Sequence, residues 1–345
     1  MLSNVLLSIL SDLEVFDMSK KTPQMRICVT PRCNLHCVYC TPEGEGYAEN
    51  PNESMGREEI NQIIKTSVAV GFTHFKFTGG EPLLRSDMVD IISDTRQISG
   101  VQEIQMVTNG TLLERHAESL KSAGLTSVTI SIDAANPETY KQIRGGKLQL
   151  VLASLRKCQQ INLPVRINTV LMKKNLGEVM PLIDLAHEAG ASLKFLDLMD
   201  LDRVDGSYDF WKEEYYPFDQ LVRWLEDKGG KFVGLEETPG GVGAPCLEYR
   251  MPNGLQVVLK DSVRGTFYAD YCATCPLFPC QDALISLRIT HDGHLKMCLA
   301  RNDNLLDILT PLRDRDLSKV NDRLKDRFEI LSGSVFYPYK WKPRL

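Results

Sequence analysis

Short apolar segments alternate with longer segments of helical periodicity from Met25 to about Leu198. In the segment 58–70, Ile60, Ile63 and Ile64 recur at the spacing that places side chains on one face of a helix. Such alternation is typical of an α/β fold with a parallel sheet. The predicted strands are Met25–Val29, His74–Phe77, Glu103–Val107, Ser127–Ile132, Val165–Val170 and Ser192–Leu196. The predicted helices are Glu58–Val70, Asp87–Ile98, Leu112–Ala123, Leu148–Ile161 and Glu178–Glu188.

Six strand–helix units can be arranged in two ways. Right-handed crossovers between parallel strands would wind them either into an open sheet or into part of a barrel. Hydrophobic periodicity does not distinguish these two arrangements. Glycine comes just after the last turn of three of the helices, at Gly71, Gly124 and Gly190, where a left-handed residue can end the helix.

The pattern changes after Met199. The segment 200–230 is rich in charged and aromatic residues, and we predict one connecting helix there. Its packing face would carry Trp211, Tyr215, Tyr216 and Trp224. We therefore predict three parts: an N-terminal amphipathic helix over 1–24, a barrel over 25–215 and a smaller C-terminal domain over 216–345.

The composition excludes several classes of protein. The chain has 345 residues and a net charge of −5, so nothing indicates a surface for nucleic acid, and the length needs no disulfide scaffold. Asp12 and Glu14 interrupt the first apolar segment, which therefore does not resemble a secretion signal. No stretch approaches the ~20 apolar residues that span a membrane. We expect a cytoplasmic protein whose thiols stay reduced, so grouped cysteines indicate metal binding or catalysis.

The first cysteine group is RCNLHCVYC, directly after the first predicted strand. Cys33, Cys37 and Cys40 lie where α/β folds place their chemistry, at the carboxyl end of a parallel strand. Structural zinc sites and closed iron–sulfur clusters normally take four protein ligands, so three thiolates would leave one metal position open. A zinc site completed by His36 is the alternative.

The CxxxCxxC spacing, with Tyr39 before its last cysteine, resembles the radical S-adenosylmethionine (SAM) superfamily. The segment FTGGEPLL, at 77–84, resembles the glycine-rich segment with which that family contacts SAM. The resemblance implies a partial (βα)6 TIM barrel and a [4Fe-4S] cluster on the three cysteines, with SAM on the fourth iron. Reductive cleavage of SAM would then give a 5′-deoxyadenosyl radical that abstracts a hydrogen atom from the substrate.

The order of later segments is similar to that of the GTP 3′,8-cyclase family of molybdenum cofactor biosynthesis. The similar segments include MVTNGTLL, SVTISIDAANPETYKQIRGG, PVRINTVLMK and LKFLDLM, within about residues 24–300. Carried over residue by residue, the resemblance implies SAM contacts at Tyr39, Gly79, Gly80, Glu81, Thr108, Asn109, Ser131, Arg166 and Met199. It implies substrate contacts at Arg26, Lys76 and Arg288.

The second cysteine group lies in the C-terminal third. Its members are Cys272, Cys275, Cys280 and Cys298, and Asp292-Gly293 marks the turn of a hairpin before the last of them. Such a group could hold either a structural zinc ion or a second [4Fe-4S] cluster. Because a first cluster is expected, we favour iron–sulfur.

The second group departs from the cyclase pattern. In that family three cysteines ligate the second cluster, and its open iron holds the substrate base. Here Leu284 stands in place of the middle cysteine, and Cys280 supplies another thiol, which makes four candidates and would close the cluster. Arg288 is retained, but Ser286 stands where a second phosphate-gripping arginine is expected. These changes favour a paralogue with a different substrate.

We therefore predict a radical SAM enzyme that abstracts hydrogen from a polar small molecule, such as a nucleotide or sugar, in cofactor or natural-product biosynthesis. Its partners would be this substrate and a one-electron reductant such as flavodoxin or ferredoxin, without nucleic acid or membrane. The alternatives are the GTP 3′,8-cyclase reaction and peptide modification. A zinc-stabilised binding module is the non-enzyme alternative.

Overall fold

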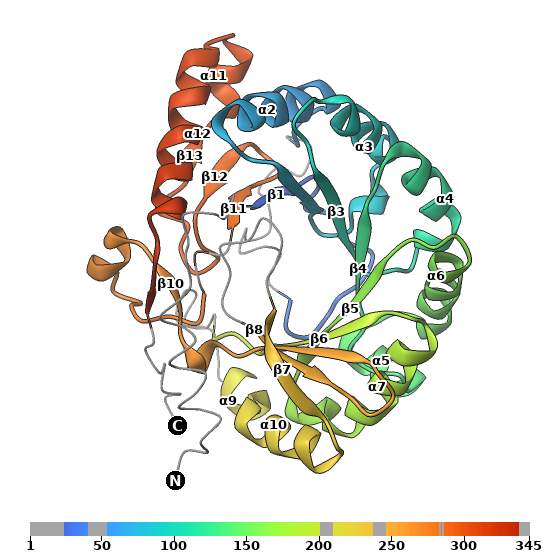
Figure 1. The fold of residues 1–345 in the computed structure, drawn as a ribbon. Coiled ribbons are helices and arrows are strands. Elements are labelled where there is room, and N and C mark those ends of the chain that lie inside the picture. The colour runs from blue at the N-terminus through green and yellow to red at the C-terminus, as the bar shows by residue number, and fades with distance from the viewer. Residues whose placement is uncertain are drawn as a thin grey trace.

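The computed structural model describes residues 24–40, 54–200, 210–236, 246–282, 284 and 286–337. The N-terminal helix predicted over 1–24 therefore lies outside the described residues, apart from Gln24, which begins the first strand. The fold is α/β, with a curved sheet whose outer face is covered by helices (Figure 1). This confirms the predicted fold class.

Six parallel strands form the middle of the sheet and follow each other in chain order. They are β1 (Gln24–Cys28), β2 (His74–Thr78), β3 (Glu103–Thr108), β4 (Ser127–Ser131), β5 (Val165–Leu171) and β6 (Ser192–Asp197). The helices that connect them are α2 (Arg57–Val70), α3 (Met88–Gln97), α4 (Leu113–Ala123), α5 (Pro137–Arg144), α6 (Leu148–Gln160) and α7 (Val179–Glu188), with short 3-10 helices η3 (Pro82–Leu84) and η4 (Lys173–Glu178). The predicted strands and helices agree with these bounds to within one residue at each end; α5 was not predicted.

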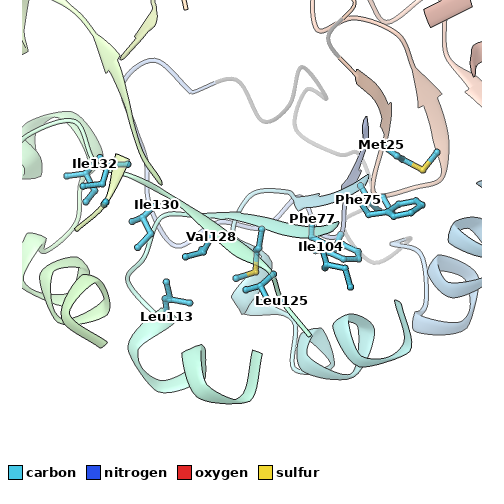
Figure 2. Packing of buried hydrophobic residues seen from close by; sticks show 14 of the residues in the cluster. Met25, Phe75, Phe77, Ile104, Leu113, Leu125, Val128, Ile130 and Ile132 are labelled. Carbon is cyan, nitrogen blue, oxygen red and sulfur yellow. The ribbon is translucent and has the colours of Figure 1, made fainter. Parts of the chain in front are cut away.

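Alternation within each strand separates the two faces of the sheet. In β1, Met25 and Ile27 are buried against the helices, while Arg26 between them takes the opposite, inner face. Figure 2 shows the helix side of this arrangement, where Phe75, Phe77 and Ile104 gather with Met25. Burial of each such side chain, relative to its exposure in the unfolded chain, stabilises the fold by about 1.5–3 kcal/mol. The polar residues of the strands are left facing the interior of the barrel.

Strands from the C-terminal third extend both edges of this sheet. At one edge, β9 (Gln256–Lys260) pairs parallel with β6 and is followed outward by β8 (Cys246–Arg250) and β7 (Lys231–Glu236). At the other, β11 (Ser286–Ile289) pairs parallel with β1 and is followed by β12 (His294–Lys296) and β13 (Leu306–Asp307). Within the described residues the sheet thus has twelve strands, with β13 at one edge and β7 at the other, and these two edge strands do not pair with each other. The predicted hairpin at Asp292-Gly293 is confirmed as β11–β12.

The prediction of one helix over 200–230 is wrong within the described residues. Two helices, α9 (Phe210–Glu214) and α10 (Phe218–Asp227), are separated at Pro217, which has no N–H to continue the first. Tyr215 instead makes a backbone bridge to Met172. The predicted packing role of the aromatic residues is confirmed for Trp211 and Tyr215, which are buried.

The remaining elements belong to the last third of the chain. The strands β10 (Thr266–Tyr268) and β14 (Val335–Tyr337) form a small separate sheet, with η5 (Ser262–Arg264) and η6 (Asp270–Thr274) beside β10 in the chain. The last helices are α11 (Leu309–Arg313) and α12 (Leu317–Ser332). Helix α12 packs on α2, where the rings of Phe72 and Phe328 meet edge to face at 5.0 Å. In the described part of the chain, no helix has both the length and the apolar character to cross a bilayer.

Candidate active site

The three cysteines of the first group lie on the loop that follows β1. Cys33 and Cys40 are exposed, and Cys37 is half-buried. The Cys40 N–H donates to the Cys37 carbonyl at 3.1 Å, which makes a tight turn between the last two thiols. The thiol of Cys33 accepts from the Leu35 N–H at 3.4 Å and from the Asn109 amide at 3.8 Å.

The glycine-rich segment after β2 is pressed against this loop. The Gly80 N–H donates to the Thr30 carbonyl and the Glu81 N–H to the Arg32 carbonyl, both at 2.8 Å. A Cβ added at Gly79 would lie 2.5 Å from the Thr30 carbonyl oxygen, and one at Gly80 would lie 2.2 Å from that of Arg32. The two glycines therefore permit close packing of two chain segments, independently of any ligand.

Glu81, which the resemblance assigned to SAM, is hydrogen-bonded within the protein. Its carboxylate is fully buried and accepts from the Thr108 hydroxyl and the Asn109 N–H, each at 2.7 Å, and from the Leu83 N–H at 3.1 Å. Burial raises the pKa of this carboxyl group, while the hydrogen bonds oppose that rise. Glu81 thus joins the ends of β2 and β3 directly beneath the cysteine loop.

The Asn109 side chain connects β3 to the cysteine loop. Its amide donates to Asn34 at 2.8 Å as well as to Cys33, and its oxygen accepts from Thr111. The other predicted SAM contacts occupy the same edge of the barrel or its interior. Ser131 is the last residue of β4, Met199 follows β6, and both are half-buried.

Tyr39 takes part in a buried network below the cysteine loop. Its hydroxyl donates to Asp133 at 2.7 Å and accepts from the Arg144 guanidinium at 2.8 Å. Arg144 also pairs with Asp133 at 2.7 Å, and both side chains are nearly inaccessible to solvent. Two backbone carbonyls at the end of α5 accept from the loop: that of Ile143 from Val38 at 2.9 Å and that of Arg144 from His36 at 3.3 Å.

The inner face of the barrel is rich in basic side chains. Arg26 and Lys76, both implied substrate contacts, are register partners in the middle of β1 and β2. Lys76 is desolvated, and this burial, together with the charges of Arg26, Arg166 and Lys194, lowers its pKa well below the ordinary value.

One carboxylate offsets part of this basic charge. Glu236 at the end of β7 forms salt bridges to Arg166 and to Lys194, the second at 3.2 Å. Burial alone would raise the pKa of Glu236, but Lys194 and Arg166 outweigh this effect and hold that pKa below its usual range. Arg166, which the sequence assigned to SAM, is therefore engaged across the barrel interior by a residue of the C-terminal third.

The four cysteines of the second group line one pocket. Cys272, Cys275, Cys280 and Cys298 are all half-buried there, together with Tyr268 and Tyr271. Burial raises the pKa of three of these thiols, those of Cys272, Cys280 and Cys298. The Cys280 thiol donates to the Asp282 carbonyl at 3.0 Å, and the Tyr268 hydroxyl donates to the Cys280 carbonyl at 2.6 Å.

The positions that depart from the cyclase pattern lie beside this pocket. Leu284 is buried and lines it. Ser286 is fully buried, and its hydroxyl has no hydrogen-bond partner among the described residues. Arg288 is also buried and donates to the Met297 carbonyl at 3.3 Å and to Asp282 at 3.5 Å. The predicted substrate contact is thus held by neighbours in the same chain.

The comparisons with known proteins identify the family. The family model of the radical SAM superfamily matches residues 27–186. A probable GTP 3′,8-cyclase of Methanococcus aeolicus is 32% identical over 90% of this chain and 97% of its own length. The GTP 3′,8-cyclase of Listeria monocytogenes is 33% identical over 80% of this chain and 78% of its own. This chain belongs to the radical SAM superfamily. It is therefore an enzyme, and the binding-module alternative is wrong.

Solved structures agree with the radical SAM fold. The structure of anSMEcpe with bound AdoMet covers 87% of this chain and 82% of its own, with a TM-score of 0.59 at 16% identity. The structure of Streptococcus suis SuiB bound to S-adenosylmethionine covers 90% of this chain and 70% of its own, with a TM-score of 0.58 at 13% identity. At such low identity the likeness concerns the fold alone.

The residues of the first group fit the cluster that the radical SAM family implies. None of the ten cysteines forms a disulfide. Among the described residues, no three Cys, His, Asp or Glu side chains surround a single metal-ion position. A [4Fe-4S] cluster does not need its ligands to meet at a single metal-ion position, because each thiolate binds a different iron. N–H groups directed at Cys33 and a buried guanidinium near Cys37 suit thiolates bound to iron.

Two further observations support this fit. The Arg144 Nε and the Tyr140 hydroxyl are buried, and no described residue other than these two side chains themselves offers either atom a hydrogen bond. Both side chains interact electrostatically with Cys37. Burial raises the pKa of the Cys37 thiol to about 12, and the positive charge of Arg144 opposes this rise. A thiolate held at this position would therefore meet polar groups that have spare bonding capacity.

Sequence reasoning missed several residues of this radical SAM site. Asp133 and Arg144 both lie in the segment SIDAANPETYKQIRGG, which had been quoted only for its resemblance. Asp133 follows β4 just as the cysteine loop follows β1, and that placement could have identified it. Glu236 and Lys194 could not be found in this way, because their pairing joins segments 42 residues apart in the chain.

Proposed function

We propose that this radical SAM enzyme acts on a nucleoside triphosphate, with GTP as the substrate and 3′,8-cyclisation as the reaction. The observation that carries this proposal is the basic inner face of the barrel, formed by Arg26, Lys76, Arg166 and Lys194. The printed names of the relatives from M. aeolicus and L. monocytogenes support the choice of GTP.

Lys76 is the residue that most favours a polyanion. It makes no salt bridge with any described residue. Arg26, Arg166 and Lys194 repel its charge, and only Glu103 opposes their effect among the charges that act on its pKa. A buried ammonium group in such surroundings is costly unless an anion accompanies it. Phosphate oxygens would offset this cost, since they accept charge-assisted hydrogen bonds from lysine and arginine.

Cys33, Cys37 and Cys40 would hold the [4Fe-4S] cluster, and SAM would bind beside it. When bound, these groups supply reductive cleavage of SAM and abstraction of a hydrogen atom. The protein's own residues would orient them. Glu81 already has three hydrogen-bond donors from the protein, so we assign it to holding the glycine segment in place. Ser131 and Met199 remain candidates for contact with SAM.

We propose that the second pocket holds a second [4Fe-4S] cluster on Cys272, Cys275, Cys280 and Cys298. Four half-buried thiols around one pocket form a complete ligand set. A reductant of the flavodoxin or ferredoxin type would supply the electron for SAM cleavage.

One observation favours a second candidate function, a paralogue that acts on another anionic small molecule. If Cys280 completes the second cluster, no iron is left there for a substrate base. Arg288, moreover, is turned to Asp282 and Ser286 replaces a phosphate-binding arginine. A nucleotide or phosphorylated sugar with fewer phosphates would suit a site with fewer arginines.

The test is anaerobic incubation with SAM, a one-electron reductant and single substrates: GTP, other nucleotides and phosphorylated sugars. We expect GTP to increase 5′-deoxyadenosine and to yield the cyclised product. If SAM is cleaved but GTP gives no product, and another compound does give one, the protein is a paralogue that acts on that compound.

A matched pair of variants tests the role of the basic inner face. Lys76→Met should weaken GTP binding by about 10-fold or more, the equivalent of one lost hydrogen bond to a charged group. Lys65→Met, on the exposed face of α2, should leave binding unchanged. Equal affinities for the two variants would contradict the proposed phosphate site.

A further inference from the structure

We propose that Arg144 is a positioning residue that fixes the cysteine loop and sets the reduction potential of the cluster that the loop holds. The inference rests on the assignment of the first cluster in the proposed function, but not on the identity of the substrate. It concerns a residue outside the CxxxCxxC sequence, at the end of α5.

The first part of the argument is mechanical. The carbonyls of Ile143 and Arg144 accept N–H groups from Val38 and His36, the residues on either side of Cys37. The Arg144 guanidinium holds the Tyr39 hydroxyl at 2.8 Å, two residues further along the loop. The end of one helix therefore fixes the conformation of the loop between Cys33 and Cys40.

Asp133 makes this support rigid. One carboxylate oxygen pairs with Arg144 and accepts the Tyr39 hydroxyl, while the other accepts the Val170 N–H at 2.9 Å. Its backbone carbonyl accepts from Asn175 at 3.0 Å, and that side chain is itself fully buried. The guanidinium is thus held by Asp133, which follows β4 and is itself fixed by groups on β5 and η4.

The second part is electrostatic. The groups that interact with the Arg144 charge are Tyr39, Asp133, Cys37 and Tyr140, of which Asp133 carries the opposing charge. Cys37 stands between the two loop residues that donate to the end of α5, beside the Arg144–Asp133 pair. Both side chains of this pair are buried, and low dielectric strengthens their interaction with charge on the loop.

A positive field beside the cluster favours its reduced state. Reduction transfers one electron from the external reductant to the cluster, which adds one negative charge without breaking a bond. Arg144 stabilises that added charge and so raises the potential, whereas Asp133 lowers it. The structure consequently predicts opposite signs for the removal of the two charges.

The experiment is a redox titration of the purified, cluster-loaded protein, monitored by the electron paramagnetic resonance signal that SAM perturbs. Arg144→Gln should shift the midpoint potential to a more negative value and Asp133→Asn to a more positive one. Arg144→Lys keeps the charge and should lie closer to the wild type than Arg144→Gln does.

Arg156→Gln on the exposed face of α6 is the matched control, and its potential should equal that of the wild type. Iron and sulfide content of each variant reports the mechanical role separately. An unchanged potential in Arg144→Gln with full iron, or shifts of the same sign in Arg144→Gln and Asp133→Asn, would overturn the proposal. If Arg144→Gln does not retain the cluster, the test rests on Asp133→Asn. A midpoint potential of Asp133→Asn that equals that of the wild type, or is more negative, would then overturn the proposal. A wild-type protein that binds no cluster would instead contradict the proposed function.

Discussion

In the loop after β1, Cys33 and Cys40 are exposed to solvent, whereas the four cysteines of the C-terminal pocket are all half-buried. The first loop is held from below by buried polar groups, chiefly Glu81, Asp133 and Arg144. The pocket is instead enclosed by aromatic side chains, including Tyr268 and Tyr271. We infer that the two regions have different roles. A loop with two exposed thiols suits a cluster that must also bind SAM, and four half-buried thiols suit a cluster complete in itself.

The largest expected effect separates the two regions by chemistry. Replacement of Cys33, Cys37 or Cys40 by alanine should lower the rate of 5′-deoxyadenosine formation by more than about 100-fold, because even outer-shell partners of metal ligands contribute about 10- to 100-fold. Cys158→Ala, a core position on α6, is the control. Cleavage of SAM by a folded Cys37→Ala protein would contradict the assignment of the first cluster to these three cysteines.

The next effect concerns iron content. With two clusters the protein should carry about eight irons per chain, and Cys280→Ala should lower that value toward four if the second cluster is lost. If Cys280→Ala loses one cluster, or changes its spectrum, and still cleaves SAM, the result supports Cys280 as a ligand of a separate second cluster. A Cys280→Ala protein that has the full iron content and an unchanged spectrum would show that Cys280 is not a ligand.

The support of the first loop can be measured as stability. Glu81→Gln replaces one carboxylate oxygen by an NH₂ group and leaves at least one buried donor without its acceptor. We expect a loss of about 1–3 kcal/mol in the free energy of unfolding, measured by urea denaturation. Glu114→Gln, exposed on α4, should change it by less than about 0.5 kcal/mol. Equal midpoints for the two variants would mean that Glu81 is not a structural support.

The smallest effect belongs to the support of the second region. Asp261 precedes Ser262, whose hydroxyl donates to the Gln281 carbonyl next to Cys280 at 3.2 Å. Burial raises the pKa of Asp261 to about 6, although Arg264 opposes the rise. The folded protein therefore retains a proton that the unfolded chain releases at lower pH, and this contribution to stability is lost as the pH rises from about 4 to about 6.

Asp261→Asn should remove that pH dependence. Between pH 5 and pH 7 the wild type should lose about 1 kcal/mol more than the variant does. Urea denaturation at several pH values gives the difference. A wild type whose stability rises relative to the variant over this interval would reverse the sign and refute the assignment.

The barrel strands and helices could be predicted from the sequence because their periodicity is local. The edges of the sheet could not. The partners Arg26 and Arg288, adjacent on β1 and β11, are more than 250 positions apart in the chain, and parallel pairing leaves no local signature. The division into domains at residue 215 stays a prediction, although strands on both sides of it share one sheet.

The cysteines of the candidate site were evident from their spacing, but the roles of neighbouring residues were not. Gly79 and Gly80 had been interpreted through a ligand, whereas contact with Thr30 and Arg32 already requires glycine there. The burial of Glu81 could not be predicted, because a sequence does not reveal which donors will surround a carboxylate. Asp133 and Arg144 form a pair only once α5 folds back onto the loop.

The addition of β9 and β11 to the two edges of the barrel sheet has a consequence for biosynthesis of the chain. When the ribosome has made residues up to 200, both β6 and β1 still have an unpaired edge, which is a template for aggregation. Long-range pairing of this kind is slow to form. The nascent barrel therefore cannot be completed until the last third of the chain has emerged, and a fragment ending near residue 215 should be prone to aggregate.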